Sequence, residues 1–131
     1  MLALAGFLNG ARYEAAKGGP RYLACYELET AETWKTAEYL AFREHPSAWT
    51  QRIALSPNGR NYVRHVCTQI FPDKNDPAVL GRGMAPALQI GRMVVPSVIE
   101  SKYNYYYDNV RTPANLEVPG CLAVRRSHGR Q

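Results

Sequence analysis

Two runs of alternating apolar and polar residues, separated by a turn sequence, constrain the fold of this chain most strongly. The runs cover residues 7–14 and 21–28, and Lys17-Gly18-Gly19-Pro20 lies between them. Because successive side chains of a strand point to opposite faces, each run predicts a strand, and the turn joins the two as a β-hairpin. Residues 21–28 are apolar on both faces, which indicates a strand covered on both sides.

After the hairpin, helices and strands alternate. Apolar residues at helical spacing predict a helix over residues 31–43, with Thr30 as its N-cap, and a second helix from Ser97 to about Asp108. Residues 72–86 are rich in Pro, Gly, Asp and Asn, so we expect a connector there. The remaining strands are expected in three segments rich in β-branched and aliphatic residues, at 61–71, 87–95 and 120–127.

The expected order is therefore a β-β-α-β part over residues 1–71, the connector, and a β-α-β part over residues 87–131. A ferredoxin-like unit runs β-α-β-β-α-β, and a rotation of the order found here gives that unit plus one extra strand. At 131 residues the chain has room for one modest core. The prediction is one α+β domain over residues 1–131, with a ferredoxin-like antiparallel sheet, two main helices on one face and a permuted element order.

The extra strand coincides with an internal repeat. Residues 2–12 align with residues 116–126 at a constant offset of 120 − 6 = 114, and leucine, glycine, leucine and arginine recur at matching positions. Arg12 and Arg126 are equivalent in this repeat. Two interpretations stay open: these arginines line paired cavities as substrate-binding residues, or they are charges at sheet edges.

Composition excludes several classes of protein. Hydrophobic residues make up 46% of the chain, and no apolar run approaches the ~20 residues of a membrane span. The first residues lack the basic flank of a signal peptide. We therefore expect a cytoplasmic protein without membrane contact. The net charge of +5 comes from scattered residues, apart from three arginines near the C-terminus, so nucleic acid is not an expected partner. Three widely spaced cysteines and three histidines lack ligand spacing, and we expect no metal and no cofactor.

The hairpin and the second helix resemble a known superfamily. Arg12-Tyr13-Glu14 together with residues 19–28 is similar to the second and third strands of the dimeric α/β-barrel superfamily, and most of all of EthD-like proteins. Residues 103–108, Pro113 and Val118-Pro119-Gly120 resemble its first-helix signature of aromatic, Tyr, Asp, any residue, Glu, His, any residue and Pro, followed by Val-Pro-Gly. The resemblance implies a barrel completed by a second copy, as a homodimer. It also implies tandem relatives that extend before Met1 and beyond Gln131.

The chain departs from that signature at one position that matters for chemistry. Where the signature carries Glu-His, this chain has Val110-Arg111. A histidine there serves as an acid or base near neutral pH, whereas an arginine stays protonated. Arg111 is instead suited to hold an anionic substrate or an oxyanion.

The resemblance implies a cofactor-free enzyme, an isomerase, cyclase, lyase or decarboxylase, that acts on a small apolar or aromatic carbonyl compound. His65, Tyr107 and Asp108 are its candidate catalytic residues. The candidate substrate-binding residues are Arg111, Tyr106, Arg12 and Arg126. The alternative is a non-catalytic module of the same fold that binds a small ligand or serves in assembly. Purely structural roles also stay open for these residues. In that case His65 lies on the surface, Asp108 and Arg111 form an ion pair, and the tyrosines pack on the sheet.

Overall fold

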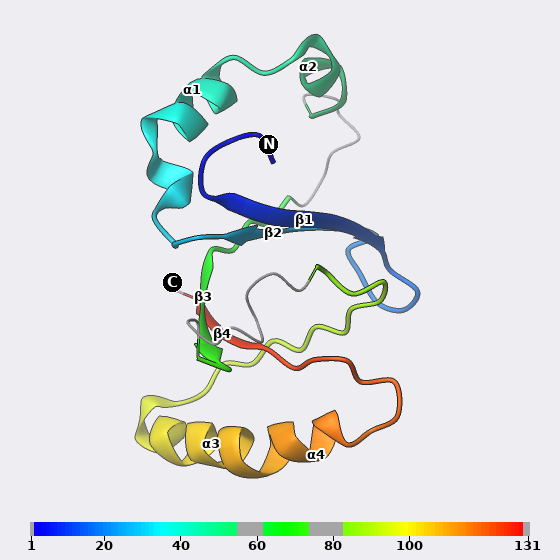
Figure 1. Ribbon diagram of the computed structural model, residues 1–131, viewed down its shortest axis with the longest axis vertical. Helices are drawn as coiled ribbons and strands as arrows, with labels where there is room; N and C mark the ends of the chain where they lie inside the picture. Colours follow the sequence, from blue (N-terminus) through cyan, green and yellow to red (C-terminus); the bar gives the residue numbers. More distant parts are fainter. Residues whose placement is uncertain (1, 55–61, 74–82, 130–131) are drawn as a thin grey trace. The chain divides into compact units, whose positions relative to one another are not determined.

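The computed structural model describes residues 2–54, 62–73 and 83–129 (Figure 1). The chain forms two compact units, Met1–Thr68 with Gly129–Gln131, and Gln69–His128. It is a small α+β protein, as predicted. The elements in chain order are β1 (Phe7–Glu14), β2 (Tyr22–Leu28), η1 (Thr33–Lys35), α1 (Ala37–Glu44), α2 (Ala48–Ala54), β3 (Cys67–Phe71), η2 (Ser97–Ile99), α3 (Glu100–Tyr106), η3 (Tyr107–Arg111), α4 (Thr112–Leu116) and β4 (Arg126–Gly129).

The predicted hairpin is confirmed by the antiparallel pairing of β1 with β2. Gly18 in the connecting loop has a φ of 85°, a conformation that costs glycine little, and the Ala15 N–H donates a 2.8 Å hydrogen bond to the Arg21 carbonyl to close the loop. The register places Gly10 opposite Tyr26. Because faces alternate along a strand, residue 12 shares the face of Gly10 and Tyr26.

The core of the first unit is an aromatic cluster between the hairpin and α1. Phe7 is 9% exposed and Tyr39 is 4% exposed, and their rings stack with centroids 5.6 Å apart. Tyr26 meets the edge of Phe7 at 6.0 Å. Since such pairs are worth about 0.5–1.5 kcal/mol beyond their buried area, these three rings hold α1 against one face of the hairpin.

The first predicted helix starts six residues later than expected. Residues 33–35 form the short helix η1, and Thr36 then turns to an extended backbone before α1 begins. The Thr36 side chain accepts a hydrogen bond from the Tyr39 N–H, so Thr36 is the N-cap, and the prediction of Thr30 was wrong. Thr30 instead bonds within the preceding turn, where its N–H and hydroxyl approach the Thr33 hydroxyl.

The predicted helix in the second unit is confirmed and runs on to Leu116, but it contains a wider turn. From Tyr107 to Arg111 the helix is of the π type, and the Thr112 N–H donates to the Tyr107 carbonyl five residues earlier. Pro113 has no N–H to offer to the carbonyl of Asn109, as an α-helix would require at this point. The position without an N–H, Pro113, therefore follows directly after the π turn. Such turns occur often at functional sites.

The strand predictions after the hairpin were largely wrong. Residues 87–95 form no strand, β3 covers only 67–71 of the expected 61–71, and β4 begins at Arg126 rather than at residue 120. Within the described ranges the chain builds two two-stranded sheets, β1-β2 and β3-β4, in place of the single antiparallel sheet predicted. Residue 61 and most of the expected connector, 74–82, lie outside the described residues.

The internal repeat has a local structural counterpart. Gly6 and Gly120, which are equivalent in the repeat, have φ angles of 81° and 88°. Each glycine lies in the same kind of turn. The Phe7 N–H donates to the Leu4 carbonyl at 3.3 Å, and the Cys121 N–H donates to the Val118 carbonyl at 3.0 Å. The copies differ beyond the turn, since β1 begins at once whereas residues 121–125 form no strand.

Candidate functional site

Three of the predicted site residues meet in one polar cluster of the second unit. Arg126 of β4 donates from Nη1 to the Asp108 carboxylate and from Nη2 to the Asn104 side-chain oxygen, the latter at 2.6 Å. Its guanidinium carbon lies 5.2 Å from the ring centroid of Tyr107 and 5.7 Å from that of Tyr103. We call Tyr103, Asn104, Tyr107, Asp108 and Arg126 the Arg126 cluster.

The two tyrosines of the Arg126 cluster lie against each other at the end of α3. Their ring centroids are 4.5 Å apart, and the Tyr103 hydroxyl donates to the Met93 sulfur at 3.3 Å. Burial raises the pKa of the Tyr103 phenol above its ordinary value, with a smaller contribution from a hydrogen bond with Tyr107, and the charge of Arg126 opposes the rise. The phenol therefore stays neutral at physiological pH and can donate a hydrogen bond.

The hydrogen-bonding groups of the Arg126 cluster are largely satisfied by one another. The Arg126 side chain is 12% exposed, and its charge faces the Asp108 carboxylate and two ring faces. A cation with a carboxylate and two aromatic rings around it has little left to offer a ligand. The Arg126 cluster thus ties β4 to α3 and η3. Catalysis by Asp108 and substrate binding by Arg126 stay predictions.

The other two candidates of the second helix, Tyr106 and Arg111, are more exposed than the Arg126 side chain. Asp108 pairs with Arg126 and not with Arg111, the partner that its spacing along the helix suggests. Arg111 is exposed, and Tyr106 is 48% exposed with its ring edge-on to Tyr107. In the first unit, His65 is exposed in the segment before β3, not in the middle of a strand as expected.

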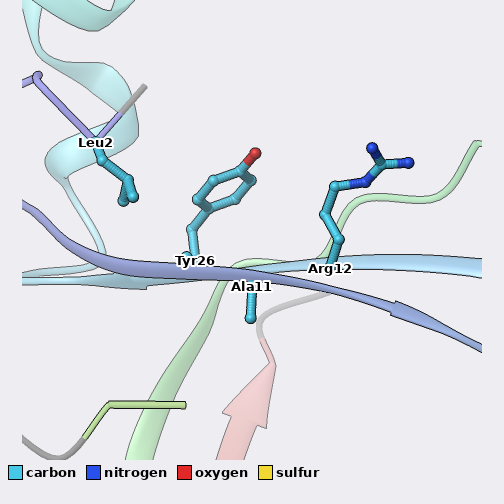
Figure 2. Close-up of a pocket in the computed structure, with 5 residues that line it drawn as sticks. Leu2, Ala11, Arg12 and Tyr26 are labelled. Carbon is cyan, nitrogen blue, oxygen red and sulfur yellow. The ribbon is translucent and has the colours of Figure 1, made fainter. Parts of the chain in front are cut away.

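The seventh candidate, Arg12, lies at a hollow on the hairpin of the first unit (Figure 2). The hollow has a volume of about 410 Å³ and is lined by Leu2, Gly10, Ala11, Arg12 and Tyr26. We call it the hairpin hollow. Figure 2 shows the side chains of Tyr26 and Arg12 on one side of the hairpin, with Leu2 of the N-terminal segment on that side as well and Ala11 pointing to the opposite side.

Gly10 allows the Tyr26 ring to lie close against β1 at the hairpin hollow. A Cβ at this position would lie 2.9 Å from Cδ1 of the Tyr26 ring and 3.3 Å from Cδ2 of Leu2, so the Tyr26 ring covers the glycine directly. Tyr26 thereby extends the aromatic core formed with Phe7 to the edge of the hollow. Arg12 is exposed on the same face, and the described residues offer its guanidinium no hydrogen-bond or ion-pair partner.

Sequence reasoning missed Leu2, Gly10, Tyr26 and Asn104 as parts of these two sites. For Gly10 and Tyr26 the signal was present, because the hairpin pattern puts a glycine across from a tyrosine and next to Arg12. For Asn104 the signal was its position four residues before Asp108, which places the two on one helix face. For Leu2 no signal existed, since its position follows from the folding of the N-terminal segment.

Comparison of the chain with protein-family models, with curated proteins and with solved structures finds no match. The resemblance to EthD-like proteins therefore depends on the quoted residues alone. The described part of the chain contains no group of three or more histidine, cysteine or acidic residues placed to hold a metal ion. In the same part, no helix is both long enough and apolar enough to cross a membrane.

Proposed function

We propose that this chain is a non-catalytic module that binds a small apolar or aromatic carbonyl compound in the hairpin hollow. The observation that carries the proposal is the arrangement around Gly10, where Leu2, Tyr26 and Arg12 lie on one side of the hairpin and line the same hollow. Ligand sites combine apolar walls with a few polar groups that fix orientation, and typically measure ~300–1,000 Å³. The 410 Å³ of the hairpin hollow falls within that range.

The described residues support binding more than the cofactor-free catalysis that the resemblance implies. Isomerisation, cyclisation or decarboxylation needs an acid or base whose pKa lies near the working pH. The pKa of the Cys25 thiol is raised by burial, and the pKa of Tyr103 is raised as well, so both move away from neutrality. Neither residue lines the hairpin hollow, and neither do the expected catalytic residues His65 and Asp108.

The binding proposal is tested by following backbone amides of the ¹⁵N-labelled chain in NMR spectra during titration with benzaldehyde. We expect shifts at Gly10, Arg12 and Tyr26, and no loss of benzaldehyde beyond that in a protein-free control. Shifts confined to other residues would refute the proposed site. Loss of benzaldehyde faster than in a protein-free control would refute the non-catalytic role.

A matched pair of glycine variants makes this test specific. In Gly10→Ala the new methyl group displaces the Tyr26 ring, and we expect benzaldehyde binding to weaken about tenfold, the equivalent of one lost aromatic contact. Gly91→Ala is the control, because a Cβ at residue 91 meets no atom within 4 Å. Equal affinities in the two variants would contradict the proposal.

Assembly with a second copy is a further proposal, supported by the sheets. A lone two-stranded sheet is marginally stable in water, and both sheets of the described chain have two strands. Among the described residues only Phe7 and Tyr39 form the buried apolar core, whereas Leu8 and Tyr22 of the hairpin are more than half exposed. The repeat adds that residues 121–125, the counterpart of the start of β1, form no strand. A homodimer that completes a ferredoxin-like sheet, as in a dimeric α/β-barrel, would supply the missing strands.

Sedimentation velocity over a hundredfold range of protein concentration tests the assembly proposal. The chain has a mass of 14.7 kDa, so we expect a species of twice that mass that dissociates on dilution. A monomer throughout the range would contradict the proposed homodimer. It would leave the binding proposal to the NMR experiment.

We also propose that the protein is cytoplasmic. Cys25, Cys67 and Cys121 are free thiols. Thiols persist in the reducing cytosol, which supports the expected cytoplasmic location.

A further inference from the structure

We infer that the ligand of the hairpin hollow is a planar aromatic carboxylate, whose carboxylate is held by Arg12 and whose ring lies beside Tyr26. This inference depends on the proposed binding function and names the ligand class. It starts from Arg12, an exposed guanidinium next to an aromatic ring, for which the described residues supply no acceptor. A guanidinium presents paired N–H donors that match the two oxygens of a carboxylate.

The repeat shows what the equivalent arginine binds. Arg126, the counterpart of Arg12, lies over the faces of Tyr103 and Tyr107 and donates to the Asp108 carboxylate. Arg12 has an aromatic neighbour in Tyr26, but no described carboxylate takes the place of Asp108. The other arginine at the hairpin, Arg21, is paired with Glu14 at 2.9 Å. Arg126 and Arg21 each bind a carboxylate of the chain, and a carboxylate is the group that Arg12 lacks among the described residues.

Charge balance favours a carboxylate over a phosphate. Arg12 is the one charged side chain among the residues described as lining the hairpin hollow. A carboxylate carries one negative charge, which one guanidinium neutralises, whereas a phosphate monoester carries nearly two near neutral pH. The second charge of a phosphate would meet only Leu2, Gly10, Ala11 and Tyr26, and none of these is a cation.

The spacing on the strand pair favours a ring next to the carboxylate. Tyr26 lies directly opposite Gly10, and Arg12 lies two residues beyond Gly10 on the same face, so Tyr26 and Arg12 are diagonal neighbours. Such neighbours lie about 7–8 Å apart, which is close enough for one small molecule to reach both. A ring beside Tyr26 gains an aromatic contact, and Leu2 supplies the apolar wall on the same side of the hairpin.

The test compares four probes that separate the ring from the charge: benzoate, benzaldehyde, acetate and phenyl phosphate. NMR titrations of the full-length chain give each dissociation constant. We expect benzoate to bind at least about tenfold more tightly than benzaldehyde or acetate, because a charge-assisted pair and an aromatic contact act together. We also expect benzoate affinity to fall as salt is added.

Two arginine variants complete the design. Arg12→Gln should reduce benzoate affinity to that of benzaldehyde, while Arg12→Lys, which keeps the charge and loses the paired donors, should give an intermediate value. Arg43→Gln is the control, since it removes the same charge from an exposed position on α1 of the same unit. The amide spectrum of β1 and β2 shows whether each variant keeps the hairpin.

The outcomes distinguish the inference from the function beneath it. If benzaldehyde binds as tightly as benzoate, or if Arg12→Gln leaves benzoate affinity unchanged, the carboxylate inference is wrong and the binding function stands. Tighter binding of phenyl phosphate would replace the carboxylate with a phosphate and overturn the charge argument. If none of the four probes shifts residues of the hairpin hollow, both the inference and the proposed function fail.

Discussion

Replacing Arg126 by alanine should destabilise the second unit. The substitution removes the hydrogen bonds to Asp108 and Asn104 and the contacts with the Tyr103 and Tyr107 rings. It also leaves the Asp108 carboxylate without its cation. Because the Arg126 side chain is 12% exposed, water replaces these partners only in part.

The magnitude follows from the individual contacts. The Asp108 side chain is 36% exposed, so its pair with Arg126 lies between a surface ion pair, worth about 0.2–1 kcal/mol, and a charge-assisted hydrogen bond, worth about 1.5–3 kcal/mol. The Asn104 bond contributes about 1 kcal/mol, and each ring about 0.5–1 kcal/mol. Since contacts that share one group are not additive, we expect Arg126→Ala to lower the free energy of unfolding by about 2–4 kcal/mol.

Hydrogen–deuterium exchange of the amides in residues 100–116 measures this effect where it should occur. Arg126→Ala should speed exchange there, and Asp108→Asn, which keeps an acceptor and loses the charge, should have a smaller effect of about 1 kcal/mol. Arg92→Ala is the control, because Arg92 is exposed in the same unit. If Arg126→Ala and Arg92→Ala agree within about 0.5 kcal/mol, the Arg126 cluster does not hold β4 to the helix, and the reasoning fails.

Three further predictions concern the cap, the core and the tyrosine pair. Thr36→Ala should lower the free energy of unfolding in urea by about 1 kcal/mol, because the Tyr39 N–H loses its acceptor, while Thr36→Ser should be close to neutral. Phe7→Ala should cost about 3–4 kcal/mol by the same measurement, since the Phe7 ring stacks on Tyr39, and a loss under 1 kcal/mol would mean that this core is not formed. Folding raises the pKa of the Tyr103 phenol above 10.0, so at high pH the unfolded chain loses the phenol proton before the folded chain does. The free energy of unfolding should therefore be unaffected below pH 10 and fall as the pH rises through the pKa of the folded state. Circular dichroism across that range should show a smaller fall in Tyr103→Phe than in Tyr105→Phe, whose residue is 70% exposed in the native chain.

The sequence predicted best what is decided locally. The hairpin needs only a turn and two alternating runs, and both lie within residues 7–28. The helix after Ser97 likewise follows from its own periodicity. The N-cap of α1 was misplaced because Thr30, Thr33 and Thr36 each offer a suitable hydroxyl, and the choice depends on contacts of the folded turn.

The later strands could not be predicted, because a strand depends on a partner far away in the sequence. The aliphatic run at residues 87–95 has the composition of a strand, yet no described residue pairs with it. The partner of Asp108 could not be predicted for a related reason. Its partner Arg126 lies 18 residues later, whereas the spacing suggested Arg111, and the effect of Pro113 on the intervening turn was not visible in the periodicity.

The central claim is that the hairpin hollow is a ligand site, and intermolecular nuclear Overhauser effects test it most directly. In a sample of the full-length chain with benzoate, the account predicts contacts from the benzoate ring protons to the Tyr26 ring and the Leu2 methyl groups. Contacts to Tyr103 and Tyr107 alone, or none to any residue at saturating benzoate, would contradict it.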